Sequence, residues 1–292
     1  MIFEWIHQYR FTFRVTKMCQ VFGVSRSGYY DWLHRKQSDQ EKRRKKLVTR
    51  IHHHFLESRR LYGSPKITQC LWKEGIRVSQ KTVARLMQKH GLVSRTVKKY
   101  KATTDSKHSL PVYENTLNRR FSVHKPNQVW VSDITYVPTK EGWLYVASVM
   151  DLFSRKIIGW HADKQMTKEL VITALDRAYQ RQQPPKGVLH HSDRGSQYAS
   201  HDYQDRLKEY KMEPSMSRKG DCLDNAVIES FHGVLKRELV HLSTFDTRKQ
   251  AKLAIFEYIE CFYNRKRIHS ALGYLSPDQF ERMYANAHSS AA

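Results

Sequence analysis

Apolar residues recur at helical spacing through the N-terminal third of the chain and are interrupted by short turns. Within residues 14–33, Gly23 suits a sharp turn and Ser25 suits the N-cap of the helix that follows it. This pattern predicts two short helices joined as a helix-turn-helix unit. The basic run at residues 42–46 then leads into a further amphipathic helix that reaches Phe55.

A second helix-turn-helix unit is predicted over residues 64–90. Ser64 and Pro65 have the order of a helix N-cap followed by proline in the first turn, and Gly75 suits the end of that helix. Ser79 suits the N-cap of the next helix, which has Val83, Leu86 and Met87 on its inner face. We expect its outer face to contact DNA through Gln80, Lys81, Arg85 and Lys89. The alternative is an ordinary helical hairpin within a scaffold.

From about residue 121 the apolar period changes to the alternation that is typical of β-strands. The predicted strands cover residues 128–137, 143–150, 155–160 and 188–191, and the predicted helices cover residues 167–181, 201–210 and 223–239. Three hairpin-connected strands followed by a helix, a strand and more helices indicate an α/β layer with a mixed sheet.

Composition limits the class of protein. The chain has 292 residues, of which 40% are hydrophobic, so it can bury a proper core. Its longest apolar runs fall short of a membrane span, and the first residues lack the basic and apolar regions of a secretory signal. Four scattered cysteines are typical of reduced thiols. We therefore expect a cytoplasmic protein, and its charge suggests association with the nucleoid.

The positive charge is concentrated toward the N-terminus. Residues 1–110 contain 25 Lys and Arg against 7 Asp and Glu, which accounts for +18 of the net charge of +23. Such a local excess is typical of a surface that binds a polyanion, and it makes Arg43 and Arg44 candidate DNA contacts. A solvated basic surface is the alternative interpretation. Because phosphate neutralisation releases counterions, DNA affinity should fall steeply with salt.

Three carboxylates stand out by their predicted positions. Asp133 lies within the first core strand, Asp193 directly follows the strand at 188–191, and Glu229 lies on the helix at 223–239. A carboxylate within a core strand is costly unless it meets a cation, and strand ends are where α/β sheets form their sites. Acids converging from three elements suit hard divalent cations such as Mg²⁺, which prefer oxygen ligands and bridge to phosphates. The alternative for each acid alone is an ordinary surface carboxylate.

Basic and polar side chains accompany these acids. The helical period puts Glu229, His232 and Lys236 on one arc of their helix, opposite an apolar arc that includes Ile228 and Phe231. We expect Lys236, together with Arg194 beside Asp193, to hold DNA phosphates, and His232 to help position the strand.

The residues around the three acids resemble those of the OrfB-type transposases of the IS3 insertion-sequence family, whose catalytic core is similar to retroviral integrases. The strings that carry the resemblance are VWVSDITY at 129–136, WLY at 143–145, DLFSR at 151–155, HSDRGSQY at 191–198, SMSRKG at 215–220, DNAVIESF at 224–231 and YNRKRIHSALGY at 263–274. Asp193 and Glu229 are separated by 35 residues, the spacing that names this DDE class. The chain departs from the family pattern at Asp221, Leu223 and His232, where Asn, Trp and often Phe are common.

The resemblance implies a ribonuclease-H-like catalytic core with a mixed five-stranded sheet, preceded by small all-α helix-turn-helix modules. It implies that Asp133, Asp193 and Glu229 are catalytic and bind two Mg²⁺ ions, with Mn²⁺ as a substitute. The implied reaction is cleavage at the element ends to expose a 3′-OH, followed by attack of that 3′-OH on another phosphodiester. It also implies an assembly of at least two copies on double-stranded DNA, and a possible fusion with an upstream OrfA-type protein.

These observations predict a domain organisation. We expect a helix-turn-helix-like segment at residues 1–40, a second DNA-binding module at 41–93, a basic linker at 94–120, a catalytic core at 121–285 and a disordered tail at 286–292.

Three other functions are compatible with parts of the sequence. A tyrosine recombinase would use His191 and Arg194 of an H-x-x-R string with Tyr198 or Tyr203 as nucleophile, and would need no metal. A DNA-binding regulator or an inactive transposase component would use the helix-turn-helix units alone. Hydrolysis of RNA–DNA hybrids is a third option for the same fold.

Overall fold

The computed structural model describes residues 1–95 and 112–289, and the chain divides into two compact units at His53 and His54. The first unit contains three short helices and most of a fourth: α1 (Ile2–Gln8), α2 (Val15–Val21), α3 (Arg26–His34) and α4 (Asp39–Glu57). A small core of Ile6, Met18, Cys19 and Tyr29 holds the first three together. The Ser25 hydroxyl accepts a hydrogen bond from Gly28 N–H at 3.0 Å, which confirms the predicted N-cap.

The second unit begins with the predicted helix pair, α5 (Ser64–Lys73) and α6 (Gln80–Lys89). The Ser79 hydroxyl caps α6 by accepting a hydrogen bond from Thr82 N–H at 3.2 Å. The apolar residues of α6 that were expected to face inward, Val83, Leu86 and Met87, are buried. Helix α5 includes Ser64, and its N-cap is Gly63, one residue earlier than predicted.

This unit also contains a five-stranded mixed sheet. Its strands are β1 (Val129–Thr139), β2 (Gly142–Asp151), β3 (Ile157–Asp163), β4 (Leu189–Ser192) and β5 (Glu213–Met216), in the spatial order β3-β2-β1-β4-β5. The first three strands are antiparallel neighbours, whereas β4 runs parallel to β1 and β5 parallel to β4. Strand β1 therefore has an antiparallel neighbour on one side and a parallel neighbour on the other.

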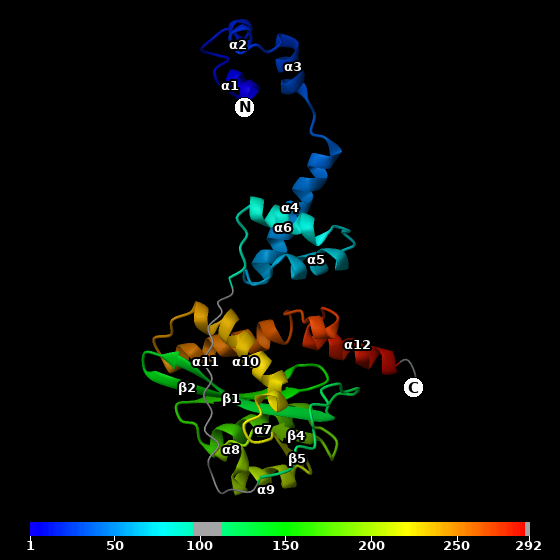
Figure 1. Ribbon diagram of the computed structural model, residues 1–292, viewed down its shortest axis with the longest axis vertical. Coiled ribbons are helices and arrows are strands. Elements are labelled where there is room, and N and C mark those ends of the chain that lie inside the picture. Colours follow the sequence, from blue (N-terminus) through cyan, green and yellow to red (C-terminus); the bar gives the residue numbers. More distant parts are fainter. Residues whose placement is uncertain (96–111, 290–292) are drawn as a thin grey trace. The chain divides into compact units, whose positions relative to one another are not determined.

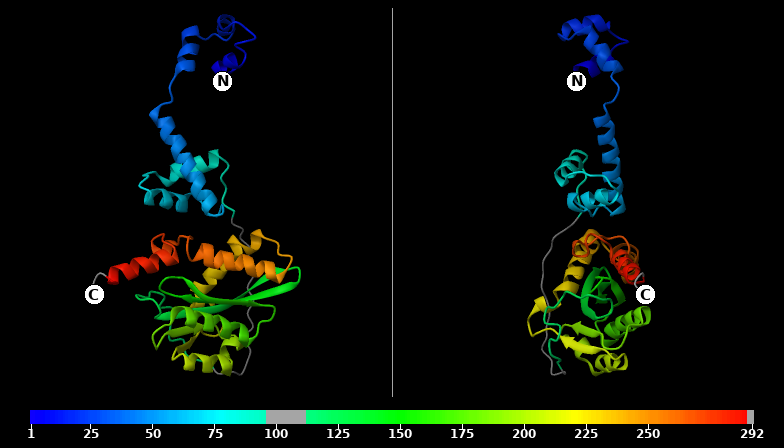
Figure 2. Two further views of the ribbon diagram at one scale, coloured as in Figure 1. Left: turned by 180° about the vertical axis from the view of Figure 1, so that it is seen from behind. Right: turned by 90° about the vertical axis from the view of Figure 1, so that its right-hand side faces the viewer.

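Helices cover both faces of the sheet (Figures 1 and 2). One face carries α7 (Lys168–Gln182), α8 (Ser196–Ala199) and α9 (His201–Glu209), and the other carries α10 (Ala226–Glu238), α11 (Arg248–Phe256) and α12 (Pro277–Ser289). Gly159 allows α7 to approach β3 closely, because a Cβ atom there would lie 2.6 Å from the backbone nitrogen of Ala178. This layered arrangement is the ribonuclease-H-like fold that the sequence predicted.

Part of the expected linker packs against the sheet. Residues 96–111 lie outside the described residues, but residues 112–120 pack beside β5. Leu117 is buried, its N–H donates to the Ser215 hydroxyl at 3.2 Å, and Met216 N–H donates to the Glu114 carbonyl at 3.3 Å. Helix α12 extends to Ser289, into the expected tail, where residues 286–289 contain no proline or glycine.

Helix α11 runs directly into a π-helix, η3 (Glu257–Tyr263), which buries Tyr258, Ile259, Phe262 and Tyr263.

None of the helices among residues 1–95 and 112–289 is both long and apolar enough to cross a membrane.

Candidate active site

The pairing of β1 with β4 brings two of the predicted acids to neighbouring strands. Ser132 and Ser192 are register partners in this parallel pair, and the next residues along the two strands are Asp133 and Asp193. Adjacent strands lie about 4.8 Å apart, so Asp133 and Asp193 occupy neighbouring positions in the backbone. The Asp193 carboxylate accepts a hydrogen bond from Gly195 N–H at 2.9 Å, which shapes the turn after β4.

Helix α10 brings the third acid toward the first. The side-chain amide of Asn225, at the N-cap of α10, donates to the Ser132 carbonyl at 3.0 Å and fixes the start of the helix to β1. Glu229 lies one turn further along. Partial burial and then the negative charge of Asp133 raise the pKa of Glu229 above its ordinary value. The negative charge of Asp133 therefore disfavours ionisation of Glu229.

Tyr198 connects the other pair of acids. Burial raises its pKa well above the ordinary value, and the charges of Asp133 and Asp193 both add to this effect. Asp133 therefore affects the pKa of Glu229 and, together with Asp193, that of Tyr198. Within the described residues, no three His, Cys, Asp or Glu side chains form a group that could share a metal ion. Asp133 thus lies within the central strand, Asp193 directly follows the parallel strand beside it, and Glu229 lies on α10, which starts against β1.

His232, which was expected on the polar arc of its helix and near the DNA strand, is buried against the sheet. It is only 5% exposed, and its Nδ1 lies 3.2 Å from Asp133 Oδ2 while its Nε2 lies 3.3 Å from the Ser148 hydroxyl. Asp133 and Ser148 are cross-strand partners in β1 and β2, so α10 presses His232 against this polar pair. The imidazole holds the Asp133 carboxylate by a hydrogen bond.

The two basic residues expected near the acids are half-buried. The Lys236 ammonium lies 4.3 Å from the centre of the Tyr136 ring, a cation–π contact between α10 and β1. The Arg194 Nε donates to the Ser217 carbonyl at 2.6 Å and so ties the turn after β4 to the segment after β5. Both positive charges therefore lie on elements that carry the candidate acids.

The remaining expected DNA contacts lie on helices of the N-terminal part. On α6, the side chains of Lys81, Arg85 and Lys89 are all exposed, opposite the buried face of that helix. On α4, Arg43 and Arg44 are exposed as well. Each set presents positive charge to solvent.

The sequence reasoning gave no role to Ser148 or Asn225, which hold His232 and the start of α10. Asn225 lies within the helix predicted over residues 223–239, whereas α10 begins at Ala226, so the predicted boundary hid its position at the start of the helix. For Ser148 the signal would have been a polar residue in an otherwise apolar strand.

Both tyrosines considered as possible nucleophiles are buried, which argues against a tyrosine recombinase. Tyr198 and Tyr203 are each 1% exposed, and the Tyr203 hydroxyl lies 3.1 Å from His190 Nε2. Burial raises the pKa of both hydroxyls, which disfavours the ionised form that would attack a phosphate.

Comparison with known proteins agrees with this architecture. The family model described as an integrase core domain matches residues 123–222, a second model of the same description matches residues 229–284, and an HTH-like domain matches residues 42–100. The HTLV-2 integrase catalytic core domain in complex with magnesium is 18% identical, with a TM-score of 0.40, over 53% of this chain and 97% of that chain.

Two curated relatives match nearly their full length. The insertion element IS600 uncharacterized 31 kDa protein of Shigella sonnei is 46% identical over 91% of this chain and 98% of its own. Transposase InsF for insertion sequence IS3A of Escherichia coli (strain K12) is 42% identical over 96% of this chain and 98% of its own. With an integrase core, an HTH-like domain and relatives of this similarity, the chain belongs to the IS3 family of insertion-sequence transposases.

Proposed function

We propose that this protein cleaves DNA at the ends of its insertion sequence and joins the exposed 3′-OH ends to another phosphodiester, with Asp133, Asp193 and Glu229 as the catalytic acids. The observation that carries the proposal is their convergence. The parallel pairing of β1 with β4 supports it for Asp133 and Asp193, and burial followed by the charge of Asp133 raises the pKa of Glu229, which supports it for the third acid.

The donor set fits Mg²⁺, or Mn²⁺ in its place. Carboxylate oxygens are the ligands that Mg²⁺ prefers, and the ion is commonly bound by one or two carboxylates plus water and substrate phosphates. The carboxylates of Asp133, Asp193 and Glu229 therefore suit this ion. A bound cation would also offset the effect of the Asp133 charge on Glu229. Two bound ions would supply activation of the attacking oxygen and stabilisation of the leaving oxygen.

The chain's other residues bind and orient the DNA in this proposal. His232 holds the carboxylate of Asp133 in one orientation, and Lys236 and Arg194 place positive charge next to the acids. The exposed basic side chains of α6 and α4 bind the duplex; those we assign are Lys81, Arg85, Lys89, Arg43 and Arg44.

The proposal includes an assembly. Joining two element ends requires both in one complex, so we propose at least two copies of this chain on double-stranded DNA. An upstream OrfA-type protein, as a fusion partner, would add further contacts to the ends.

The test is incubation of the purified protein with labelled DNA that carries both ends of its element, in Mg²⁺, in Mn²⁺ or in EDTA. We expect nicks with free 3′-OH ends and joined products in either metal, none in EDTA, and no protein bound covalently to DNA. Asp193→Asn should bind the DNA without cutting it. Asp205→Asn is the matched control, because Asp205 is exposed on α9 and pairs with Lys208.

Cleavage by Asp193→Asn at the rate of the control would refute the assigned role of this acid. Binding without cleavage by the unmodified protein, alone and with its upstream partner, would favour a DNA-binding regulator instead.

A further inference from the structure

Asp224 is a fully buried carboxylate immediately before the helix that carries Glu229. It lies in the 3-10 turn η1 (Cys222–Asn225), which leads directly into α10, and its side chain is 0% exposed. A buried carboxylate is costly unless cations and hydrogen bonds compensate its charge. The partners of Asp224 therefore indicate what holds this turn in place.

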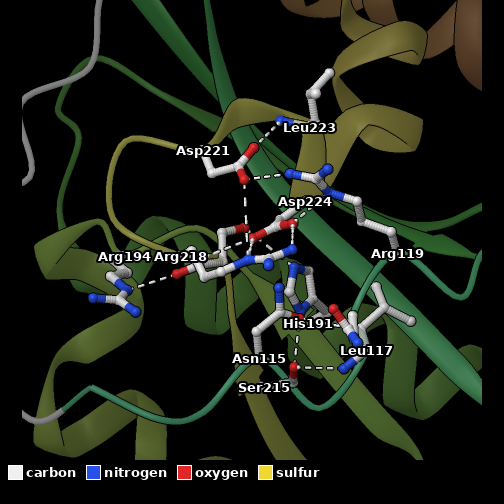
Figure 3. Close-up of polar contacts among 12 residues, drawn as sticks. Asn115, Leu117, Arg119, His191, Arg194, Ser215, Arg218, Asp221, Leu223 and Asp224 are labelled. Atoms are coloured by element: carbon white, nitrogen blue, oxygen red, sulfur yellow. Dashed lines mark hydrogen bonds and ion pairs between the residues drawn. The ribbon is translucent and has the colours of Figure 1, made fainter.

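Two arginines grip this carboxylate (Figure 3). Oδ2 accepts hydrogen bonds from the backbone N–H and the Nε of Arg218, both at 2.9 Å. Oδ1 accepts from Arg218 Nη2 and from Arg119 Nε, both at 2.8 Å. The hydrogen bonds from Arg218 are the main reason why the pKa of Asp224 lies well below its ordinary range. Arg119 also pairs with Asp221, which begins the same turn.

The two arginines come from segments that are far apart in the sequence. Arg218 follows β5, whereas Arg119 belongs to the stretch before β1 that packs beside β5. Asp224 thus joins three stretches of chain at one point. We call Asp224, Arg119 and Arg218 the Asp224 clamp.

The residue after Asp224 makes the connection to the candidate site. Asn225 donates to the carbonyl of Ser132, and Ser132 immediately precedes Asp133. The start of α10 is therefore fixed on one side by the clamp and on the other by β1. Because Glu229 lies within the first turns of α10, its carboxylate moves with the start of the helix.

We propose that Asp224, held by Arg119 and Arg218, is a positioning residue that sets Glu229 at its distance from Asp133, an inference that rests on the proposed function. The clamp and the Asn225 hydrogen bond together hold the start of α10, and with it Glu229, against β1. Arg119 makes this placement depend on the docking of residues 112–120 beside β5.

Two variants test the clamp. Asp224→Asn keeps the shape of the side chain and removes its charge. Arg119→Gln removes the ion pairs of Arg119 with Asp224 and Asp221 and leaves all three hydrogen bonds from Arg218 in place. Arg120→Gln is the matched control, because it removes the same charge at the next position, where Arg120 is exposed and donates to the Thr116 carbonyl.

The readouts are the Mg²⁺ concentration at half-maximal DNA cleavage and the binding of Mn²⁺ alone, followed by electron paramagnetic resonance. Loss of a group that orients metal ligands commonly costs about 10–100-fold in metal affinity, so we expect an increase of about tenfold or more for Asp224→Asn and a smaller one for Arg119→Gln. Saturating metal should restore most of the cleavage rate. Thermal unfolding in EDTA shows whether each variant is folded at the assay temperature, since a purely structural defect would lower that midpoint without shifting the metal requirement of the folded protein.

Metal requirements of both folded variants equal to that of Arg120→Gln would overturn the inference. If Asp224→Asn does not fold, Arg119→Gln decides alone. Asp133→Asn separates the two proposals: if it cleaves DNA like the unmodified protein, the proposed function fails and the clamp inference fails with it. If it is inactive while the clamp variants match the control, only the clamp inference fails.

Discussion

Breaking the buried ion pair between the end of α10 and the segment after the π-helix should strongly destabilise the catalytic core. Arg267 donates through Nε and Nη2 to the two carboxylate oxygens of Glu238, both at 2.8 Å, and the side chains are only 9% and 8% exposed. The Tyr258 hydroxyl donates to the same carboxylate at 2.7 Å. Arg267→Met would leave Glu238 buried without its cation. Removal of one partner of such a pair costs about 3–5 kcal/mol.

Urea-induced unfolding of the full chain, followed by tryptophan fluorescence, measures this loss. Arg267→Met, Glu238→Gln and the double variant form a double-mutant cycle. We expect each single variant to lose stability and the double variant to lose less than the sum, because it leaves neither charge unpaired. Single variants that each lose less than about 1 kcal/mol would refute the reasoning, since that is the range of exposed pairs.

The same pair has a pH signature. Burial alone would raise the pKa of Glu238, but the hydrogen bonds and charge of Arg267 lower it below its ordinary value. A carboxyl with a lowered folded-state pKa stabilises the protein above its ordinary pKa, and this contribution disappears as the pH falls through the folded-state pKa. The unmodified protein should therefore lose this part of its stability in acid, and Arg267→Met should lack it at every pH.

Three further predictions concern the site and the core. Glu229→Gln should raise the thermal unfolding midpoint in EDTA at neutral pH. Burial and the charge of Asp133 raise the pKa of Glu229, so its ionised form is unfavourable in the folded state. A midpoint at or below that of the unmodified protein would contradict this. His232→Phe should increase the Mg²⁺ concentration for half-maximal cleavage by about 10–100-fold, because it removes the hydrogen bond to Asp133; an unchanged requirement would show that this bond does not orient the carboxylate. Burial raises the pKa of Asp151 from 3.8 to about 7, so the free energy of unfolding should fall by up to about 4 kcal/mol as the pH rises through that interval. Asp151→Asn should remove this fall when urea unfolding is measured at pH 4 and pH 8, and an equal fall in the variant would assign the slope to other groups.

The helix pair of the HTH-like domain could be predicted from the sequence because its signals are local. Ser79 caps α6 from the position immediately before it, and the buried residues Val83, Leu86 and Met87 follow the helical period. Strand β5 lacked such signals, since it has four residues and contains Pro214.

His232 shows what a helical period cannot provide. The period gives the angle of a residue about the helix axis, but the neighbours depend on how the helix crosses the sheet. Helix α10 crosses β1 and β2 where Asp133 and Ser148 are cross-strand partners, so a residue of the polar arc is buried against them.

Two of the candidate acids could be selected from the sequence, whereas the Asp224 clamp could not. Asp133 and Asp193 could be selected because each is tied to a strand, and strands follow an alternating pattern. Arg119 and Asp224 are 105 residues apart and lie in irregular segments. Their pairing depends on the packing of residues 112–120 beside β5, which no periodic signal encodes.

The position of β1 in the sheet also bears on when its two neighbours can pair with it. The hairpin of β1 with β2 is local, whereas β4, the other neighbour of β1, follows β2, β3 and α7 along the chain, and α10 comes later still. Pairings between distant segments form slowly because loop closure has an entropic cost. A chain that is still being synthesised therefore contains Asp133 before Asp193 and Glu229 have been added, so the proposed site can form only once α10 has been made.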